Sequence, residues 1–332
     1  MAVAPGPRNL ITDVDGILVG QAEDRSARTG TTVVLPERRC VAGADVRGGA
    51  PGTRDVEALD PTCLVDAVDA IVLSGGSAFG LDAASGVMAW LVDQERGFAA
   101  GGHIVPIVPA AILYDLANGG DKSWRDTPPY RELGRSAAQS AGSDVALGNA
   151  GAGIGATAGA LKGGLGSASA ITDDGLQVGA LVAVNAAGSA IIPGTRTLWA
   201  SLFEQQQEMG SPPRDLQAGD MELDASVKGF PAENTTIGVV TTNAALDRAQ
   251  ARRVAIMAHD GLARAIRPIH TPFDGDTVFC LATGTLENPV EPAILGGIGA
   301  LAADCMTRAV GRAMVAAESI GELVAYKDWL VC

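Results

Sequence analysis

The sequence predicts an α/β layered fold, in which helices cover β-sheets. Apolar segments with the alternation or continuous run typical of strands are interleaved with segments that repeat apolar residues at helical spacing. Hydrophobic residues make up 47% of the 332 residues, which is ample for a large buried core. The 43 glycines and an aromatic content of 4% indicate close backbone packing and many tight turns. Strands and helices that interleave in this way form layered α/β folds.

Strands are expected where short apolar segments lie between turn residues. They are residues 10–20, 30–36, 68–74, 177–185, 236–242 and 277–282. The third of these strands runs through the glycine-rich residues 75–80 into a helix from Leu81 to about Gln94. A further apolar stretch at 103–116 contains two prolines, so we do not expect it to form one regular element.

Two later helices are predicted from their periodicity and composition. Residues 249–266 place apolar or small residues on one face at helical spacing, namely Val254, Met257, Ala258, Gly261, Leu262 and Ala265. Residues 291–318 are rich in small residues, which suits tight packing between layers. Residues 203–234, by contrast, are polar, acidic and interrupted by proline and glycine, and a structureless loop this long is often functional or disordered.

The charge and cysteine content disfavour several classes of partner and site. A net charge of −14 argues against nucleic acid, because phosphate binding needs a basic surface. The five cysteines are scattered and form no C-x-x-C pair, so we expect buried free thiols rather than disulfides or a zinc site. The sequence has no uninterrupted apolar run of about 18 residues and no basic-then-apolar leader at its start. We therefore expect a cytoplasmic protein with no metal, no cofactor and no membrane partner.

The bond between Asn234 and Thr235 lies where the polar segment meets an apolar strand. A hydroxyl at that position can attack the preceding carbonyl, form an ester by an N→O acyl shift, and be released by water. The product carries a free α-amine on the same residue as the hydroxyl. Because such an amine has a pKa of about 8, it can act as the general base for its own Oγ. Asn-Thr-Thr before a strand is also ordinary turn chemistry, so the residue types alone leave both interpretations open.

Four further residues are candidates for supporting this chemistry. Asp274 and Asp276 form either a tight turn or a carboxylate pair, in which Asp274 would polarise the Thr235 amine or hydroxyl and Asp276 would hold that arrangement. Two carboxylates this close repel, so one pKa should rise. Lys162, in a Gly- and Ala-rich stretch, is either a positive charge at the nucleophile or a loop residue. Asn185 ends a strand, either as an oxyanion donor or as a cap.

Two other features have simpler interpretations. Gly151, Gly153 and Gly155 loosely match a dinucleotide-binding fingerprint, but no clear strand precedes them and no acidic residue follows at the usual place. His259 lies near the apolar face of its helix, where we expect a packed helix residue rather than a base.

Long motifs in the sequence resemble a known family. Residues 234–284, NTTIGVVTTNAALDRAQARRVAIMAHDGLARAIRPIHTPFDGDTVFCLATG, closely resemble the self-cleaving family of L-aminopeptidase/D-esterases and β-peptidyl aminopeptidases. The segments NLITDVDGILVG and SGGSAFGLDAASGVMAWL resemble the same family, so the resemblance covers nearly the whole chain. The family's threonine branch includes the nylon-oligomer (6-aminohexanoate oligomer) endohydrolases.

The resemblance implies a fold and a set of site residues. The fold is a four-layer αββα sandwich similar to that of N-terminal nucleophile hydrolases, with different connectivity. Thr235 matches the family's nucleophile, Asp274 and Asp276 its acidic partners, Lys162 and Asn185 its supporting residues, and Tyr114 a tyrosine that lines the substrate pocket. A single domain of residues 1–332 would be cut into an α chain, 1–234, and a β chain, 235–332, which stay together and assemble as tetramers.

The expected function is hydrolysis of amide bonds in small linear peptides or amide oligomers, including 6-aminohexanoate oligomers. The aminopeptidase members carry serine after glycine as their nucleophile, whereas this chain has threonine after asparagine. This departure favours the threonine branch and argues against strict aminopeptidase specificity. The alternatives are an aminopeptidase or β-peptidyl aminopeptidase, a non-catalytic small-molecule binding relative that is not cleaved, and a nucleotide-dependent oxidoreductase.

Overall fold

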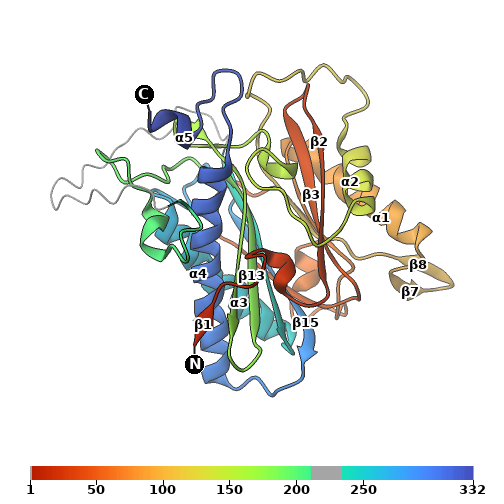
Figure 1. The fold of residues 1–332 in the computed structure, drawn as a ribbon. Helices are drawn as coiled ribbons and strands as arrows, with labels where there is room; N and C mark the ends of the chain where they lie inside the picture. The colour runs from red at the N-terminus through yellow and green to blue at the C-terminus, as the bar shows by residue number, and fades with distance from the viewer. Residues whose placement is uncertain (1, 211–233, 332) are drawn as a thin grey trace.

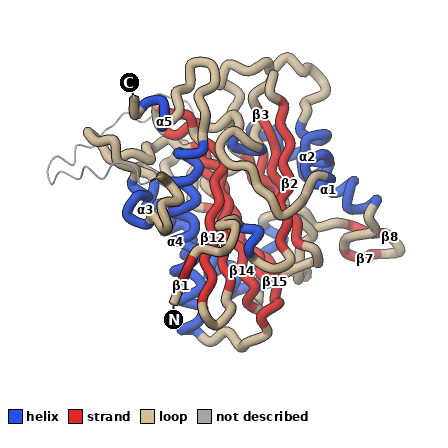
Figure 2. Tube along the Cα trace, viewed as in Figure 1, coloured by secondary structure: helices blue, strands red, loops and turns tan. Residues whose placement is uncertain are grey.

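The computed structural model describes residues 2–210 and 234–331, which form four layers (Figure 1). Two β-sheets pack face to face, and a pair of helices covers the outer face of each sheet (Figure 2). The first sheet is covered by α3 (Arg248–Ala265) and α4 (Pro292–Ala316), and the second by α1 (Asp82–Asp93) and α2 (Tyr130–Gln139). This is the αββα arrangement that the resemblance implied.

The first sheet carries the C-terminal strands. Its order is β1 (Val3–Ala4), β12 (Gly164–Thr172), β13 (Gln177–Asn185), β14 (Thr235–Ala244), β15 (Thr277–Leu286) and β4 (Val41–Val46). Neighbouring strands are antiparallel except β14 and β15, which are parallel. Because parallel strands start at the same edge of a sheet, the residues before β14 and before β15 lie at one edge.

The second sheet is built from the N-terminal part of the chain. Its order is β2 (Ile17–Asp24), β3 (Thr29–Pro36), β6 (Ile71–Ser74), β9 (Ala110–Ile112) and β5 (Thr53–Arg54). Two small ladders pair β7 (Phe98–Ala100) with β8 (His103–Val105), and β10 (Thr157–Ala158) with β11 (Leu161–Lys162). Short helices complete the described part: η1 (Ile11–Asp13), η2 (Glu57–Leu59), η3 (Ser77–Leu81), η4 (Gly151–Gly153), η5 (Trp199–Phe203) and α5 (Tyr326–Trp329).

The apolar core lies between the layers. The cluster between the two sheets contains Val34 and Leu73 from the second sheet and Leu181, Ile237 and Phe279 from the first. Because side chains alternate along a strand, Thr235 lies on the same face of β14 as Ile237 and therefore faces the second sheet. The same rule places Asn185 on the inner face of β13, with Leu181.

Most predicted elements are confirmed, and one is wrong. Strands occupy 30–36, 177–185, 236–242 and 277–282, and the predicted strand at 68–74 is shorter, beginning at Ile71. The first half of the predicted strand 10–20 is instead the η1 turn. The difference is caused by Asp13. Its carboxylate accepts hydrogen bonds from the backbone N–H groups of Arg8 and Leu10 and so stabilises a turn in place of a strand.

The polar segment 203–234 is only partly as predicted. Its residues 211–233 lie outside the described residues. Before them, residues 205–207 are exposed, but Glu208 forms a buried ion pair with Arg308 of α4 and Met209 is buried. Part of the predicted linker is therefore fixed to the C-terminal half of the chain.

Helix α4 is long and apolar enough to cross a membrane by length and composition, although the sequence offered no uninterrupted apolar run. In the structure it packs against β12, β13 and α3 and contributes Ala302, Met306 and Ala309 to the core. Its composition is accounted for by this central position.

Burial of the cysteines is confirmed for three of the four that the structure describes. Cys40, Cys280 and Cys305 are buried free thiols, whereas Cys63 is partly exposed. Burial raises the pKa of Cys40 and of Cys305 to about 12, so both stay protonated and unreactive at neutral pH.

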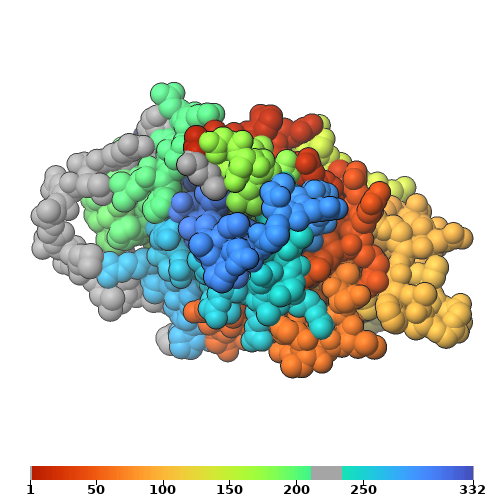
Figure 3. Space-filling model, turned by 90° about the horizontal axis from the view of Figure 1, so that it is seen from below, coloured from red at the N-terminus to blue at the C-terminus, as the bar shows by residue number. Residues whose placement is uncertain are grey.

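The hairpin of β7 and β8 projects from one end of the molecule, gold in Figure 3. Phe98, Ile104 and Val105 are exposed on it. The hairpin therefore lies outside the two-sheet core.

Candidate active site

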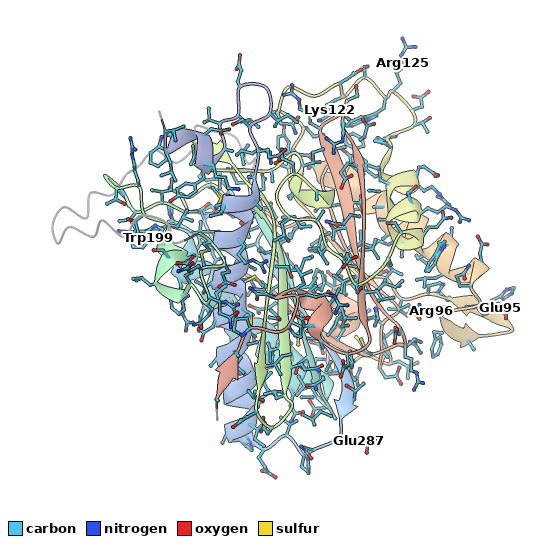
Figure 4. All side chains as sticks on the ribbon, in the orientation of Figure 1. Glu95, Arg96, Lys122, Arg125, Trp199 and Glu287 are labelled. Carbon is cyan, nitrogen blue, oxygen red and sulfur yellow. The ribbon has the colours of Figure 1, made fainter. Side chains whose placement is uncertain are left out.

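The predicted site residues gather at one end of the first sheet. Thr235, the first residue of β14, is paired across the sheet with Asn185, the last residue of β13. Asn234 pairs with Asp274 in an isolated parallel bridge just before β14 and β15 begin. Figure 4 labels Glu287, which follows β15, at the opposite end of the molecule. The parallel pairing of β14 with β15 is what brings Asp274 beside the Asn234–Thr235 bond.

The Asn234–Thr235 peptide is buried and closely contacted by Gly275. The hydroxyl Oγ1 of Thr235 donates a hydrogen bond to the carbonyl oxygen of Asn234. The backbone N–H of Gly275 donates both to that carbonyl oxygen, at 3.2 Å, and to Thr235 Oγ1, at 3.1 Å. A Cβ at Gly275 would lie 2.7 Å from Thr235 Oγ1 and 2.7 Å from the carbonyl oxygen of Ala50, so only glycine fits here. One backbone N–H thus faces both the hydroxyl and the carbonyl that it would attack.

Asp274 is held by the turn that it ends, which begins at Thr271. Its Oδ2 accepts the N–H of Thr271 at 3.0 Å and the Thr271 hydroxyl at 2.5 Å, and its Oδ1 accepts the N–H of Ala187 at 3.2 Å. Within the described residues these hydrogen bonds go to Thr271 and Ala187 rather than to Thr235. Burial raises the pKa of Asp274, and the charge of Asp276 raises it further. The expected rise of one pKa in this pair is confirmed, with burial as its larger cause.

Asp276 faces the helix layer and holds the backbone of β14. Its Oδ1 accepts the N–H of Thr236, the residue after Thr235, at 2.7 Å. Its Oδ2 accepts the backbone N–H of His270 at 3.0 Å and lies 2.7 Å from His270 Nδ1. His270 and Thr271 are site residues that the sequence pattern does not indicate, although both lie within six residues of Asp276 along the chain.

Asn185 links the site to two neighbouring segments. Its Oδ1 accepts the N–H and the hydroxyl of Thr157 at 3.0 and 3.3 Å. Its Nδ2 donates to the backbone carbonyl of Tyr114 at 3.0 Å. The backbone of Tyr114 therefore lies at the site, while the role of its side chain in lining a pocket stays a prediction.

Lys162 is fully buried and pairs with Thr157 across the β10–β11 ladder. Its Nζ donates to the carbonyl oxygens of Gly153 and Gly163, both at 2.9 Å. Burial lowers the pKa of Lys162 to about 7, against the opposing charge of Asp115. Lys162 is thus a buried amine that is about half protonated at neutral pH, and not a surface loop residue.

Asp115 is a buried carboxyl group next to Tyr114 that was not among the predicted site residues. It accepts the Thr29 hydroxyl at 2.6 Å and the Gly76 N–H at 2.8 Å, and burial raises its pKa. Its charge acts on Lys162 and on Lys122, which Figure 4 labels near the ends of β2 and β3. Asp115 follows a buried apolar strand, the same signal that drew attention to Asn185.

Two features set aside in the sequence have structural roles. His259 is buried on α3, as expected for a packed helix residue. The glycine-rich segment at 151–155 packs its backbone against β3, where a Cβ at Gly30 would lie 2.3 Å from the carbonyl oxygen of Gly151. In residues 2–210 and 234–331 no cluster of three or more His, Cys, Asp or Glu side chains is arranged to hold a metal.

Comparison with known sequences identifies close relatives. The sequence profile described as Peptidase family S58 matches residues 9–324. An uncharacterized aminopeptidase of Mycobacterium tuberculosis is 47% identical over 339 aligned residues, covering 96% of this chain and 97% of that protein. A 6-aminohexanoate-oligomer endohydrolase of a Kocuria species is 30% identical over 325 aligned residues, covering 92% of this chain and 86% of that protein.

Two solved structures share the fold. A beta-aminopeptidase of a Burkholderia species has a TM-score of 0.68 at 24% identity, covering 97% of this chain and 90% of that chain. The L-aminopeptidase D-Ala-esterase/amidase of Ochrobactrum anthropi, described as a variant of the Ntn hydrolase fold, has a TM-score of 0.69 at 23% identity, covering 100% of this chain and 95% of that chain. The four-layer architecture is therefore that of an Ntn-type hydrolase.

Proposed function

The chain belongs to peptidase family S58 and is an amide-bond hydrolase, and from this premise we propose that Thr235 is its nucleophile, made N-terminal by self-cleavage after Asn234. The observation that carries the proposal is the contact between Thr235 Oγ1 and the Asn234 carbonyl oxygen, to which Gly275 N–H also donates. The hydroxyl lies against the carbonyl group that it would attack. The Gly275 N–H is directed at the oxygen on which negative charge would develop.

Self-cleavage then follows as an N→O acyl shift. Oγ1 of Thr235 bonds to the carbonyl carbon of Asn234, and the C–N bond between the two residues breaks. The hydroxyl proton passes to the departing nitrogen, which becomes the α-amine of Thr235. Water hydrolyses the resulting ester and leaves a carboxylate on Asn234 and a free hydroxyl on Thr235.

The freed amine makes the same hydroxyl a catalytic nucleophile. An α-amine has a pKa of about 8, so at neutral pH a fraction of it is unprotonated and can accept the Oγ1 proton. Oγ1 attacks the substrate's amide carbonyl, the amine part of the substrate leaves with a proton, and water releases the acyl part. Asp274 lies beside Asn234, and the buried Lys162, with a pKa of about 7, is suited to exchange a proton near neutral pH.

The proposal is tested by substituting the hydroxyl. Purified wild-type protein should give two chains on denaturing electrophoresis and intact-mass measurement, whereas Thr235→Ala should remain whole and Thr235→Ser should still be cut. The matched control is Thr241→Val, which removes another buried hydroxyl on the same face of β14 and should leave cleavage unchanged. An uncut wild-type chain that hydrolyses amides would refute the self-cleavage mechanism.

We propose small linear peptides and amide oligomers as the substrate class. The threonine that follows asparagine supports 6-aminohexanoate oligomers, the substrate named for the 30% identical relative. The 47% identical relatives are named aminopeptidases, which supports removal of N-terminal residues as the second candidate. A panel that compares amino-acid p-nitroanilides with 6-aminohexanoate oligomers separates the two, since each candidate predicts a higher kcat/KM for its own class.

A further inference from the structure

Two histidines lie in contact with each other on the helix side of the first sheet, near the start of β15. The ring of His270 lies edge-on to that of His259 on α3, with ring centroids 4.8 Å apart. His270 holds Asp276 through both its backbone N–H and Nδ1, and Asp276 holds the N–H of Thr236. A continuous set of contacts therefore runs from α3 to the residue next to Thr235.

The protonation of His259 follows from its surroundings. Burial lowers the pKa of His259 to about 4, so the ring is neutral at neutral pH. Its Nε2 lies 3.0 Å from the carbonyl oxygen of Asp45, which can only accept, so Nε2 carries the proton. Its Nδ1, the unprotonated ring nitrogen, has no hydrogen-bond partner among the described residues. His259 is thus a fixed, uncharged ring that supports His270.

The backbone of His270 is shaped for this contact. Its φ is 57°, in the left-handed region that costs a non-glycine residue about 1 kcal/mol or more. This conformation lets the backbone N–H and Nδ1 reach the same oxygen of Asp276, at 3.0 and 2.7 Å. Because that oxygen belongs to a carboxylate and can only accept, Nδ1 is the protonated nitrogen. Strained residues of this kind persist where the surrounding contacts determine them, often at functional sites.

We propose that His270 is a positioning residue for the reaction of Thr235, an inference that rests on the proposed function. It acts through Asp276 and does not contact the hydroxyl. Asp276 is fully buried, with Oδ2 bound by His270 and Oδ1 bound by the N–H of Thr236. Fixing that carboxylate fixes the backbone at the start of β14 and hence the direction of Thr235 Oγ1. A displacement of about 1 Å at such a point lowers a rate by about 100-fold.

The experiment compares His270→Asn with His270→Gln. The Asn amide places an N–H donor where Nδ1 stands, whereas the Gln amide places it one bond further, where Nε2 stands. We expect His270→Asn to keep self-cleavage and kcat within about threefold of wild type, and His270→Gln and His270→Ala to lose about 10- to 100-fold in both at unchanged KM. His103→Ala, which removes an exposed imidazole on β8, is the control and should match wild type.

The outcomes separate this inference from the proposed function. If wild type is cut and active but His270→Gln is as fast as wild type, or His270→Asn is as slow as His270→Gln, the positioning role is refuted while the proposed function stands. If wild-type protein is neither cut nor active, the proposed function itself fails and this role fails with it. Thermal unfolding of each variant identifies any loss that comes from misfolding, and the Asn and Gln pair remains decisive if His270→Ala does not fold.

Discussion

Gly275 approaches Thr235 so closely that a single added methyl group would collide with the hydroxyl. The Cβ of an alanine would lie 2.7 Å from Thr235 Oγ1, well inside van der Waals contact. The same glycine donates its N–H to the Asn234 carbonyl oxygen at 3.2 Å. The residue between the two predicted aspartates therefore belongs to the site, and its lack of a side chain is what admits the hydroxyl.

Gly275→Ala should slow self-cleavage by about 100-fold. The added Cβ forces the backbone of residue 275 away from both Thr235 Oγ1 and the carbonyl oxygen of Ala50, so the N–H moves off the Asn234 carbonyl. The rate is measured as the loss of the uncut chain with time after rapid purification, on denaturing gels.

The control for this change is Gly297→Ala on α4. A Cβ at Gly297 meets nothing within 4 Å, and alanine favours a helix over glycine by about 1 kcal/mol, so this variant should be cut at the wild-type rate. Equal rates for the two alanine variants would show that close approach at Gly275 is unimportant.

The strands that carry the site were predictable, but their pairing was not. Residues 177–185 and 236–242 are apolar and rich in β-branched side chains, so local pattern alone identifies them. β12 was missed because its residues are mostly small, and its place is decided by tertiary contact with α4. A Cβ at Gly166 would lie 1.9 Å from the carbonyl oxygen of Ala309. Helix α4 and β12 therefore pack this closely only because residue 166 has no side chain.

The candidate site likewise contains residues that the sequence predicts and contacts that it does not. Thr235, Asn185, Asp274 and Asp276 were singled out as polar residues at strand ends, and the structure brings all four to one edge of the first sheet. The contacts of His270 depend on the left-handed turn before β15 and on its packing against α3, which no sequence period reveals. Residues that act through backbone geometry leave little trace in the sequence.

Replacing Lys162 with methionine should change how stability depends on pH. Lys162 has a pKa of about 7 in the folded chain and an ordinary value of 10.5, so between these values the unfolded chain binds more protons. Folded wild type therefore gains stability as the pH rises through this window, and Lys162→Met lacks that contribution. From pH 7.5 to 9 the free energy of unfolding of the variant, relative to wild type, should fall by about 2 kcal/mol.

This comparison is made by denaturant unfolding of the Thr235→Ala chain with and without the lysine change, so that one uncut chain unfolds in each case. Taking the difference between the two proteins cancels the titration of the buried cysteines, which both contain. Lys327→Met, at an exposed position on α5, should run parallel to its parent at every pH. Parallel curves for Lys162→Met as well would contradict the lowered pKa of Lys162.

Glu208→Ala should destabilise the chain by about 3–5 kcal/mol, because it leaves Arg308 as an unpaired charge in the interior. The two side chains are each 4% exposed, with Glu208 oxygens 2.7 and 2.8 Å from Arg308 nitrogens. Burial alone would raise the pKa of Glu208, but the hydrogen bonds and charge of Arg308 outweigh it and lower that pKa. The matched control is Asp304→Ala, which breaks the Arg264–Asp304 pair, 39% and 44% exposed, and should cost less than about 1 kcal/mol. Urea unfolding in the Thr235→Ala chain measures both losses of stability, and equal losses would contradict the interior ion pair.

Under the proposed cleavage after Asn234 the Glu208–Arg308 pair would join the two product chains, so Glu208→Ala should also weaken their association.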